Sequence, residues 1–315
     1  MGGKRKMDIF IAVLLLIAGF ALLIKGADWF VDGAAGIAAR FGIPQLVIGL
    51  TIVAMGTSAP EAAVSITAAK SGNAGITIGN VLGSNIMNIL VILGITSVIT
   101  AIAVQKSTIR YELPFMLVIT LLLMWLGRTG NEIVFWEGVV LWVFFLIYLT
   151  YLFIMAKKGQ ADEEEEKNRA LWLQVAMLVA GVAGIVLGSD LTVDNASKIA
   201  AALGMDDRLI GLTIVAFGTS LPELVTSITA ATKGKADIAI GNIVGSNIFN
   251  ILFVVGTTAL ITPVTFKPSF LVDSVVAIAA GVLLWIGVWK EQKLKRPVGI
   301  IMLVAYAAYF IYLLV

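Results

Sequence analysis

The chain carries one sequence pattern twice, at a constant offset of 162 residues. The segment GLTIVAMGTSAPE at Gly49–Glu61 returns as GLTIVAFGTSLPE at Gly211–Glu223, and GNVLGSNIMNIL at 79–90 returns as GNIVGSNIFNIL at 241–252. Residues 26–95 and 188–257 align without a gap and are identical at roughly 40 of 70 positions. Self-similarity of this length indicates an internal structural repeat. The fold must therefore be built from two copies of one unit.

Both copies are too apolar for a water-soluble protein. Of the 315 residues, 59% are hydrophobic and 13% are charged, whereas soluble domains carry about 25% charged residues. About 20 apolar residues in a helix cross a hydrocarbon core. Such stretches occur five times in each copy, near residues 8–25, 45–69, 76–101, 113–127 and 134–156, and near 170–188, 207–231, 238–262, 269–289 and 297–315. The sequence predicts an all-α polytopic membrane protein with ten transmembrane helices in contact with membrane lipid.

A charged segment, KKGQADEEEEKNR, separates the two sets of spans. We expect a first five-helix repeat at 1–156, a solvated linker at 157–169 and a second five-helix repeat at 170–315, because a run of like charges usually stays in water. A regulatory calcium site at Asp162–Glu166 is the alternative reading of this segment. Because five spans are an odd number, the second repeat enters the membrane from the opposite side. The prediction is two inverted-topology repeats.

The distribution of Lys and Arg predicts the orientation. If the termini lie outside the cell, 14 of the 22 Lys and Arg residues fall on the inner side. The positive-inside rule then places the linker in the cytoplasm and both termini outside a prokaryotic cell (plasma) membrane, although Lys4, Arg5 and Lys6 argue the other way. We expect the first span to be retained, because it lacks the small-residue pattern that ends a signal peptide.

The composition also excludes several chemistries. The chain has no Cys and no His, which removes disulfides, thiolate ligands, the usual zinc ligand and the commonest proton shuttle. A formal net charge of +2 gives no indication of a nucleic-acid partner. No cofactor is expected, and a monomer would be sufficient for a site built within one chain.

Each first motif places a glutamate, Glu61 or Glu223, inside a predicted span. A charge at the bilayer centre costs at least ~2.5–3.5 kcal/mol, so two of them at matching positions indicate function. Residues three, four and seven apart share a helix face. The residues that share the glutamates' faces are Ala54, Thr57 and Ser58 in the first copy, and Ala216, Thr219 and Ser220 in the second. Pro60 and Pro222 each remove a backbone donor, which should release the carbonyls of Gly56 and Gly218.

Each second motif adds a polar stripe with a spacing of four residues, formed by Asn80, Ser84 and Asn88 and by Asn242, Ser246 and Asn250. Carboxylate, hydroxyl, amide and carbonyl oxygens are hard ligands that suit Na⁺ and Ca²⁺. For any single Ser, Thr or Asn, helix packing is the competing explanation. Four further repeated acids lie near predicted span ends, where capping and interfacial solvation would explain them: Asp28, Asp32, Asp190 and Asp194.

The paired motifs resemble the two alpha-repeats of the cation/calcium antiporter superfamily, and the short linker resembles that of its prokaryotic sodium/calcium exchangers. The resemblance implies a ten-helix antiporter with outside termini, in which the repeats meet near the membrane midplane and bind the transported Na⁺ and Ca²⁺. It implies ligand roles for Glu61, Glu223, Thr57, Ser58, Thr219, Ser220, Ser84, Ser246, Asn88 and Asn250, and for backbone oxygens of Ala54, Thr57, Ala216 and Thr219. Many family members carry an aspartate where this chain has Asn250, so only two central carboxylates are expected.

Charge balance leads from this site to a mechanism. Two ionised glutamates carry −2, which one Ca²⁺ or two Na⁺ would neutralise, so the two kinds of ion should compete. A Ca²⁺/H⁺ antiporter that uses the same two glutamates is the main alternative. An intramembrane enzyme is disfavoured because the chain lacks His, Cys and an activated serine. A passive channel would not account for inverted, proline-broken halves.

Overall fold

A computed structural model describes residues 2–71, 74–158, 170–204 and 216–314. Eight helical stretches in this part of the chain are long and apolar enough to cross a membrane: Ile9–Phe41, Gly75–Ile99, Thr108–Gly130, Phe135–Lys158, Leu171–Ala202, Ala236–Ile261, Phe270–Trp289 and Arg296–Leu313. A bent pair, Gln45–Thr57 with Ala59–Lys70, makes up to nine. The span predicted at 207–231 lies partly outside the described residues. The prediction of a helical membrane protein is confirmed, whereas the count of ten stays a prediction.

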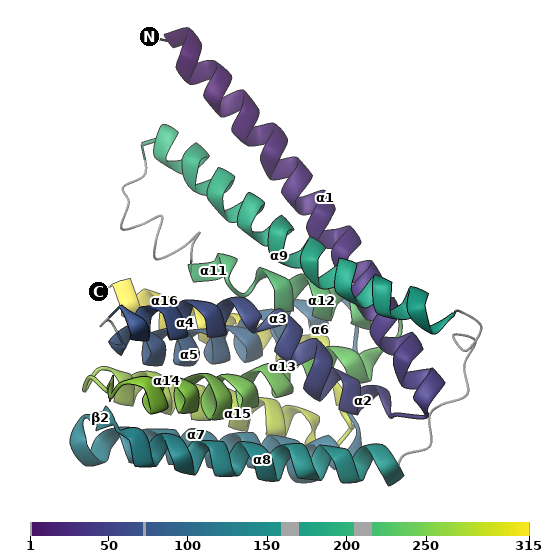
Figure 1. Ribbon diagram of the computed structural model, residues 1–315, viewed down its shortest axis with the longest axis vertical. Coiled ribbons are helices and arrows are strands. Elements are labelled where there is room, and N and C mark those ends of the chain that lie inside the picture. Colours follow the sequence, from purple (N-terminus) through teal and green to yellow (C-terminus); the bar gives the residue numbers. More distant parts are fainter. Residues whose placement is uncertain (1, 72–73, 159–169, 205–215, 315) are drawn as a thin grey trace.

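Two long helices cross each other along one side of the bundle. They are α1 (Gly2–Phe41) and α9 (Leu171–Ala202), and Figure 1 shows them crossing each other above a stack of roughly parallel helices. The predicted spans at 8–25 and 170–188 were too short, because the Ala- and Gly-rich sequence beyond them continues as helix. Each helix ends close to a glycine with positive φ, Gly42 at 67° and Gly204 at 93°.

Glycines allow α1 and α9 to touch backbone to backbone. A Cβ added at Gly26 would lie 2.7 Å from the backbone nitrogen of Ile185. A Cβ at Gly181 would lie 2.5 Å from the nitrogen of Phe30. Small residues permit such close approach of membrane helices, and buried side chains such as Phe30 and Ile185 pack beside the glycines.

The helix that carries Glu61 is broken where the sequence predicts a break. It consists of α2 (Gln45–Ile48), the π-helical η1 (Gly49–Val53), α3 (Ala54–Thr57) and α4 (Ala59–Lys70), with a bend of 48° before α4. Ser58 leaves the helical region at φ −85° and ψ 6°. In the second copy, α11 (Ala216–Gly218) and α12 (Leu221–Thr232) meet at Ser220, which has φ −94° and ψ 3°. Pro60 and Pro222 lie in the first turn of the new helices. A proline is tolerated there because the N–H groups of the first turn have no partner within the helix.

The two second-motif helices form the centre of the molecule. The first comprises α5 (Gly75–Met87), η2 (Asn88–Leu93) and α6 (Gly94–Ile99), and the second comprises α13 (Ala236–Phe249), η6 (Asn250–Val255) and α14 (Gly256–Ile261). In their most apolar windows, 78% and 94% of the residues are buried, against 11% in α16 (Arg296–Leu314). The polar stripes therefore lie inside the protein, and α16 faces its surroundings.

Two short ribbons mark the opposite ends of the outer helices. Strand β1 (Ile102–Ala103) pairs antiparallel with β4 (Lys293–Leu294), and β2 (Glu132–Ile133) pairs antiparallel with β3 (Val264–Thr265). After η3 (Thr108–Glu112), helix α7 (Leu113–Gly130) runs from the first ribbon to the second, and α8 (Phe135–Lys158) follows. Helix α15 (Phe270–Trp289) runs from the second ribbon to the first. Helices α7 and α15, which occupy matching positions in the two copies, thus point in opposite directions.

Asp28 and Asp32 form ion pairs, where the sequence suggested capping or interfacial solvation. The α1 helix continues through both residues, and they pair with lysines that follow α12. Lys233 Nζ lies 3.2 Å from Asp28 Oδ1 and 2.9 Å from Asp32 Oδ1, and Lys235 Nζ lies 3.2 Å from Asp32 Oδ1. Desolvation opposes the charge of Lys233, but its hydrogen bonds to Asp32 and Asp28 raise its pKa overall. This network ties α1 to the end of α12.

Candidate functional site

The two motif glutamates are completely enclosed by protein. Glu61 is 1% exposed in the first turn of α4, and Glu223 is 0% exposed in the first turn of α12. The N-terminal end of a helix favours negative charge nearby, so the breaks before α4 and α12 give each carboxylate a stabilising helix terminus. The two carboxylates lie close enough for a coulombic interaction.

Direct contacts join the first motif of one copy to the motifs of the other. Ser58 Oγ donates to Glu223 Oε1 at 2.9 Å, and Thr57 Oγ1 lies 2.9 Å from Asn242 Oδ1. Ser246 Oγ lies 3.4 Å from the carbonyl oxygen of Ala54. The two copies thus contribute to a single polar centre.

One asparagine in each copy fixes the helix that carries the glutamate. Asn80 Nδ2 donates to Ser65 Oγ at 2.9 Å and lies 3.2 Å from the carbonyl oxygen of Glu61. The matching Asn242 Nδ2 lies 2.9 Å from Ser227 Oγ and 3.4 Å from the carbonyl oxygen of Glu223. These paired contacts position the glutamate helices through their backbone.

Four asparagines form a reciprocal set of hydrogen bonds between α5–η2 and α13–η6. Asn88 Nδ2 donates to Asn247 Oδ1 at 3.0 Å, and Asn250 Nδ2 donates to Asn85 Oδ1 at 3.2 Å. Asn85 and Asn247 each donate to the backbone carbonyl of the other, at 3.1 and 3.2 Å. Neither of these residues was predicted as a site residue, although both lie in the repeated GSNI segment. Their bonds leave the oxygens of Asn88 and Asn250 free for another partner.

Several buried oxygens of the predicted site residues accept no hydrogen bond among the described residues. They are Glu61 Oε2, Glu223 Oε2, Asn88 Oδ1, Asn250 Oδ1 and Ser220 Oγ. A buried polar atom without a partner is costly, and carboxylate, amide and hydroxyl oxygens are ligands for hard cations. Among the described residues, no three acidic side chains lie close enough together to hold a metal ion jointly. The charge available to a bound cation therefore comes from two glutamates.

The remaining predicted ligands mostly lie buried near this centre, on α3, α5, α13 and the turn before α12. Buried are Ala54, Thr57, Ser58, Ser84, Ser220 and Ser246. Thr219 is half-buried, and the side-chain surroundings of Ala216 lie outside what the structure describes. Ser189 Oγ of α9 donates to the carbonyl oxygen of Gly218 at 2.9 Å. The carbonyl released by Pro222 is thus bound by a serine that the sequence analysis did not identify.

Two further acids lie away from this centre, each bonded to a tyrosine. Glu112 in η3 accepts a hydrogen bond from Tyr151 of α8. Asp273 in α15 accepts one from Tyr309 of α16 at 2.7 Å. Both pairs join an outer helix to its neighbour within the same copy, so they stabilise the periphery of the bundle and contribute no charge to the centre.

Comparison with known proteins identifies the class of this architecture. The model of the sodium/calcium exchanger protein family matches residues 11–154 and again residues 173–315. The chain is 40% identical over 311 residues to CaxA of Alkalimonas amylolytica, which bears the provisional description of an antiporter; 95% of this chain and 97% of that protein are covered. It is 31% identical over 344 residues to the sodium/calcium exchanger MaX1 of Methanosarcina acetivorans, with 95% and 97% covered.

The fold also matches a solved exchanger. The structure of the sodium-calcium exchanger NCX_Mj soaked with zero Na⁺ and Ca²⁺ superposes with a TM-score of 0.85 at 34% identity, covering 97% of this chain and 99% of that one. The chain belongs to the sodium/calcium exchanger family. It is therefore a membrane transporter of the cation/calcium antiport class, and Na⁺ and Ca²⁺ are cargo of the family rather than cofactors.

Proposed function

We propose that the chain is a secondary active antiporter that exchanges Na⁺ for Ca²⁺ by alternating access around Glu61 and Glu223. The observation that carries the proposal is the set of buried oxygens that have no hydrogen-bond partner among the described residues, which includes one oxygen of each glutamate. Both copies contribute to this set. Cations of the size and hardness of Na⁺ and Ca²⁺ supply the partners that these oxygens lack.

The proposed ligands are the oxygens that the motifs share. Carboxylates come from Glu61 and Glu223, and the other oxygens come from Thr57, Ser58, Thr219, Ser220, Ser84, Ser246, Asn88 and Asn250 and from the backbone of Ala54 and Ala216. The burial of most of these groups and the bond from Ser58 to Glu223 support this assignment. Asn80 and Asn242 act as positioning residues, because their amides bind the backbone of the two glutamates.

Two inverted repeats of five spans provide the framework for alternating access. Three observations support this arrangement: the opposite directions of α7 and α15, the hydrogen bonds that recur at the repeat offset, and the double match of the family model. Inverted repeats allow one bundle to rock against the other around a fixed midplane site. The glycine-lined contact between α1 and α9 makes this pair the proposed sliding element.

Charge balance explains why such a site would exchange ions rather than leak. An empty site with a charge of −2 would have a large desolvation cost when closed from water. A site that holds one Ca²⁺ or at least two Na⁺ is close to neutral and can be occluded. Only the loaded protein would then cross between its two open forms.

The direct test is the uptake of ⁴⁵Ca²⁺ into proteoliposomes with and without an opposing Na⁺ gradient. We expect uptake to require the Na⁺ gradient and to persist when the pH is equal on both sides. Uptake driven by a pH gradient in the absence of Na⁺ would instead establish the Ca²⁺/H⁺ antiporter that uses the same glutamates.

Transport should proceed without K⁺. Asn250 offers a neutral amide where many family members carry an aspartate, so the site lacks the third negative charge that would balance an additional large monovalent ion. The measurement is Na⁺-driven Ca²⁺ flux after K⁺ is replaced by choline on both sides. A flux that stops under these conditions would contradict the two-carboxylate site.

Exchange should also respond to membrane voltage. The neutral oxygens around the two glutamates are numerous enough to hold a third Na⁺, and three Na⁺ for one Ca²⁺ moves one net charge per cycle. Each such charge contributes ~2.3 kcal/mol per 100 mV, so an inside-negative potential should accelerate Ca²⁺ extrusion. Vesicles clamped with valinomycin and K⁺ at several potentials measure this. Rates that do not change with voltage would indicate two Na⁺ for one Ca²⁺.

A further inference from the structure

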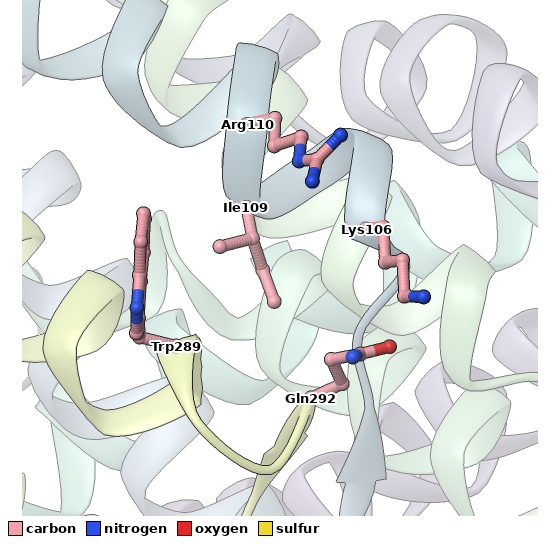
Figure 2. Close-up of a pocket in the computed structure, with 5 residues that line it drawn as sticks. All are labelled: Lys106, Ile109, Arg110, Trp289 and Gln292. Atoms are coloured by element: carbon pink, nitrogen blue, oxygen red, sulfur yellow. The ribbon is translucent and has the colours of Figure 1, made fainter.

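A small basic pocket lies at one membrane edge of the protein, away from the glutamates. It has a volume of 220 Å³ and is lined by Lys106, Ile109, Arg110, Trp289 and Gln292. Figure 2 shows these side chains arranged around the opening, with Lys106, Ile109 and Arg110 from the η3 side and Trp289 and Gln292 from the α15 side. Lys106 and Arg110 are four residues apart, so their side chains share one helix face.

Hydrogen bonds hold the two walls of this pocket in a fixed relation. Trp285 Nε1 of α15 donates to the carbonyl oxygen of Ile109 at 2.8 Å. The backbone nitrogen of Val104 donates to the carbonyl oxygen of Gln292 at 2.8 Å, beside the β1–β4 ribbon. The pocket therefore joins the first copy to the second and is formed by ordered backbone.

The pocket carries positive charge that no acid in the described part of the chain pairs with. Within the described ranges, neither Lys106 nor Arg110 forms an ion pair. The adjacent loop adds Lys290 and Lys293, and its one carboxylate, Glu291, pairs with Lys295. That hydrogen bond, together with the charges of Lys295, Lys290 and Lys293, lowers the pKa of Glu291, so Glu291 and Lys295 largely neutralise each other.

The ends of two candidate membrane spans place the pocket at the depth of the lipid headgroups. Lys106 precedes the span that begins at Thr108, and Trp289 ends the span that begins at Phe270. An exposed tryptophan at the end of a span is typical of the membrane–water interface. The positions that match Lys106 and Arg110 in the second copy are Pro268 and Val272. The pair of cations thus occurs at one end of the bundle only, the end that the sequence places in the cytoplasm.

We infer that this pocket binds the phosphate headgroup of an anionic phospholipid. Its volume is below the ~300–1,000 Å³ of pockets that enclose a drug-sized ligand, so it fits a charged headgroup whose acyl chains remain in the bilayer. Basic pockets between membrane helices are suited to anionic headgroups. Lys106 and Arg110 bind the phosphate, and Trp289 packs against the glycerol and the upper acyl chain.

The test compares the wild-type protein with the double variant Lys106→Gln/Arg110→Gln, both purified in detergent at full length. Native mass spectrometry measures the apparent affinity for the first bound phosphatidylglycerol and, separately, for phosphatidylcholine. Two direct ion pairs with the phosphate, at up to ~1 kcal/mol each, predict an affinity up to about 30-fold weaker for phosphatidylglycerol in the variant, and little change for phosphatidylcholine. Both residues are exposed, so the variant should unfold at the wild-type temperature in the absence of added lipid.

A second double variant, Lys290→Gln/Lys293→Gln, removes the same charge from the same membrane edge without altering the lining of the pocket. We expect it to keep most of the wild-type affinity. The inference would be overturned by equal losses in both variants, which would indicate a diffuse attraction, or by wild-type binding in Lys106→Gln/Arg110→Gln. Displacement of the lipid by millimolar inorganic phosphate would also overturn it, because it would assign the pocket to a soluble anion.

Discussion

Glu61→Gln and Glu223→Gln should each reduce Na⁺-driven Ca²⁺ uptake by about 100-fold or more. Each change removes one of the two charges of the site while keeping the size of the side chain and one of its acceptor oxygens. Loss of one partner from a buried charge pair costs about 3–5 kcal/mol, and every 1.4 kcal/mol is about tenfold in affinity. The measurement is ⁴⁵Ca²⁺ uptake into proteoliposomes at equal amounts of inserted protein.

A matched control is Glu132→Gln, which removes an exposed carboxylate of β2 at one end of the bundle. This variant should transport at the wild-type rate. Both site variants should still insert and remain folded, because a neutral amide lowers the desolvation cost of the enclosed centre. Wild-type uptake by either Glu61→Gln or Glu223→Gln would mean that the ions bind elsewhere.

Gly245→Ala should lower transport at least about tenfold, although Gly245 offers no ligand. A Cβ at this position would lie 2.7 Å from the backbone oxygen of Leu50 and 2.8 Å from Ala54 Cβ. Helix α13 would have to move away from η1 and α3, which would lengthen the contact between Ser246 and the Ala54 carbonyl. Overpacking of this kind costs about 1–3 kcal/mol, so a lower unfolding temperature should accompany the loss of Ca²⁺ uptake.

Gly281→Ala makes the same chemical change in α15 and serves as its control. The added methyl would first meet Leu117 Cδ2 at 2.7 Å and Met116 Cε at 3.3 Å. These atoms are the ends of flexible side chains and can move, whereas the backbone of η1 cannot. Transport and thermal stability should therefore stay near the wild-type values. Equal effects of the two substitutions would show that the close approach of α13 to η1 has no special role.

The sequence was sufficient to predict the helical membrane fold, and most of the residues that it singles out for the candidate site are buried in the structure. Glu61 and Glu223 could be recognised because a carboxylate is costly in an apolar span. The breaks at Ser58 and Ser220 could be predicted because Pro60 and Pro222 remove a backbone donor. The cost of a carboxylate in an apolar span and the missing N–H of a proline are properties of the local sequence, so a single sequence reveals both.

Features that depend on distant parts of the chain could not be predicted. Asn85 and Asn247 look like ordinary packing residues until α5 and α13 are placed side by side, where each amide binds the other residue's backbone. The full lengths of α1 and α9 were missed because a hydropathy window measures membrane thickness and not helix length. The basic pocket was missed for a similar reason, since Arg110 and Trp289 are separated by a large part of the chain.

The ion pairs between α1 and the residues after α12 make the two halves of the protein unequal. At the repeat offset, the partners of Asp190 and Asp194 would be Ser71 and Asn73 in place of Lys233 and Lys235. Any motion that carries α1 away from α12 must separate opposite charges, whereas no equivalent attraction restrains the matching motion of the other copy at these positions. A transporter built from two equivalent repeats would populate its inward-open and outward-open forms equally. We therefore expect the ion pairs among Asp28, Asp32, Lys233 and Lys235 to bias the resting orientation of the proposed exchanger, although none of these four side chains belongs to the proposed ion site.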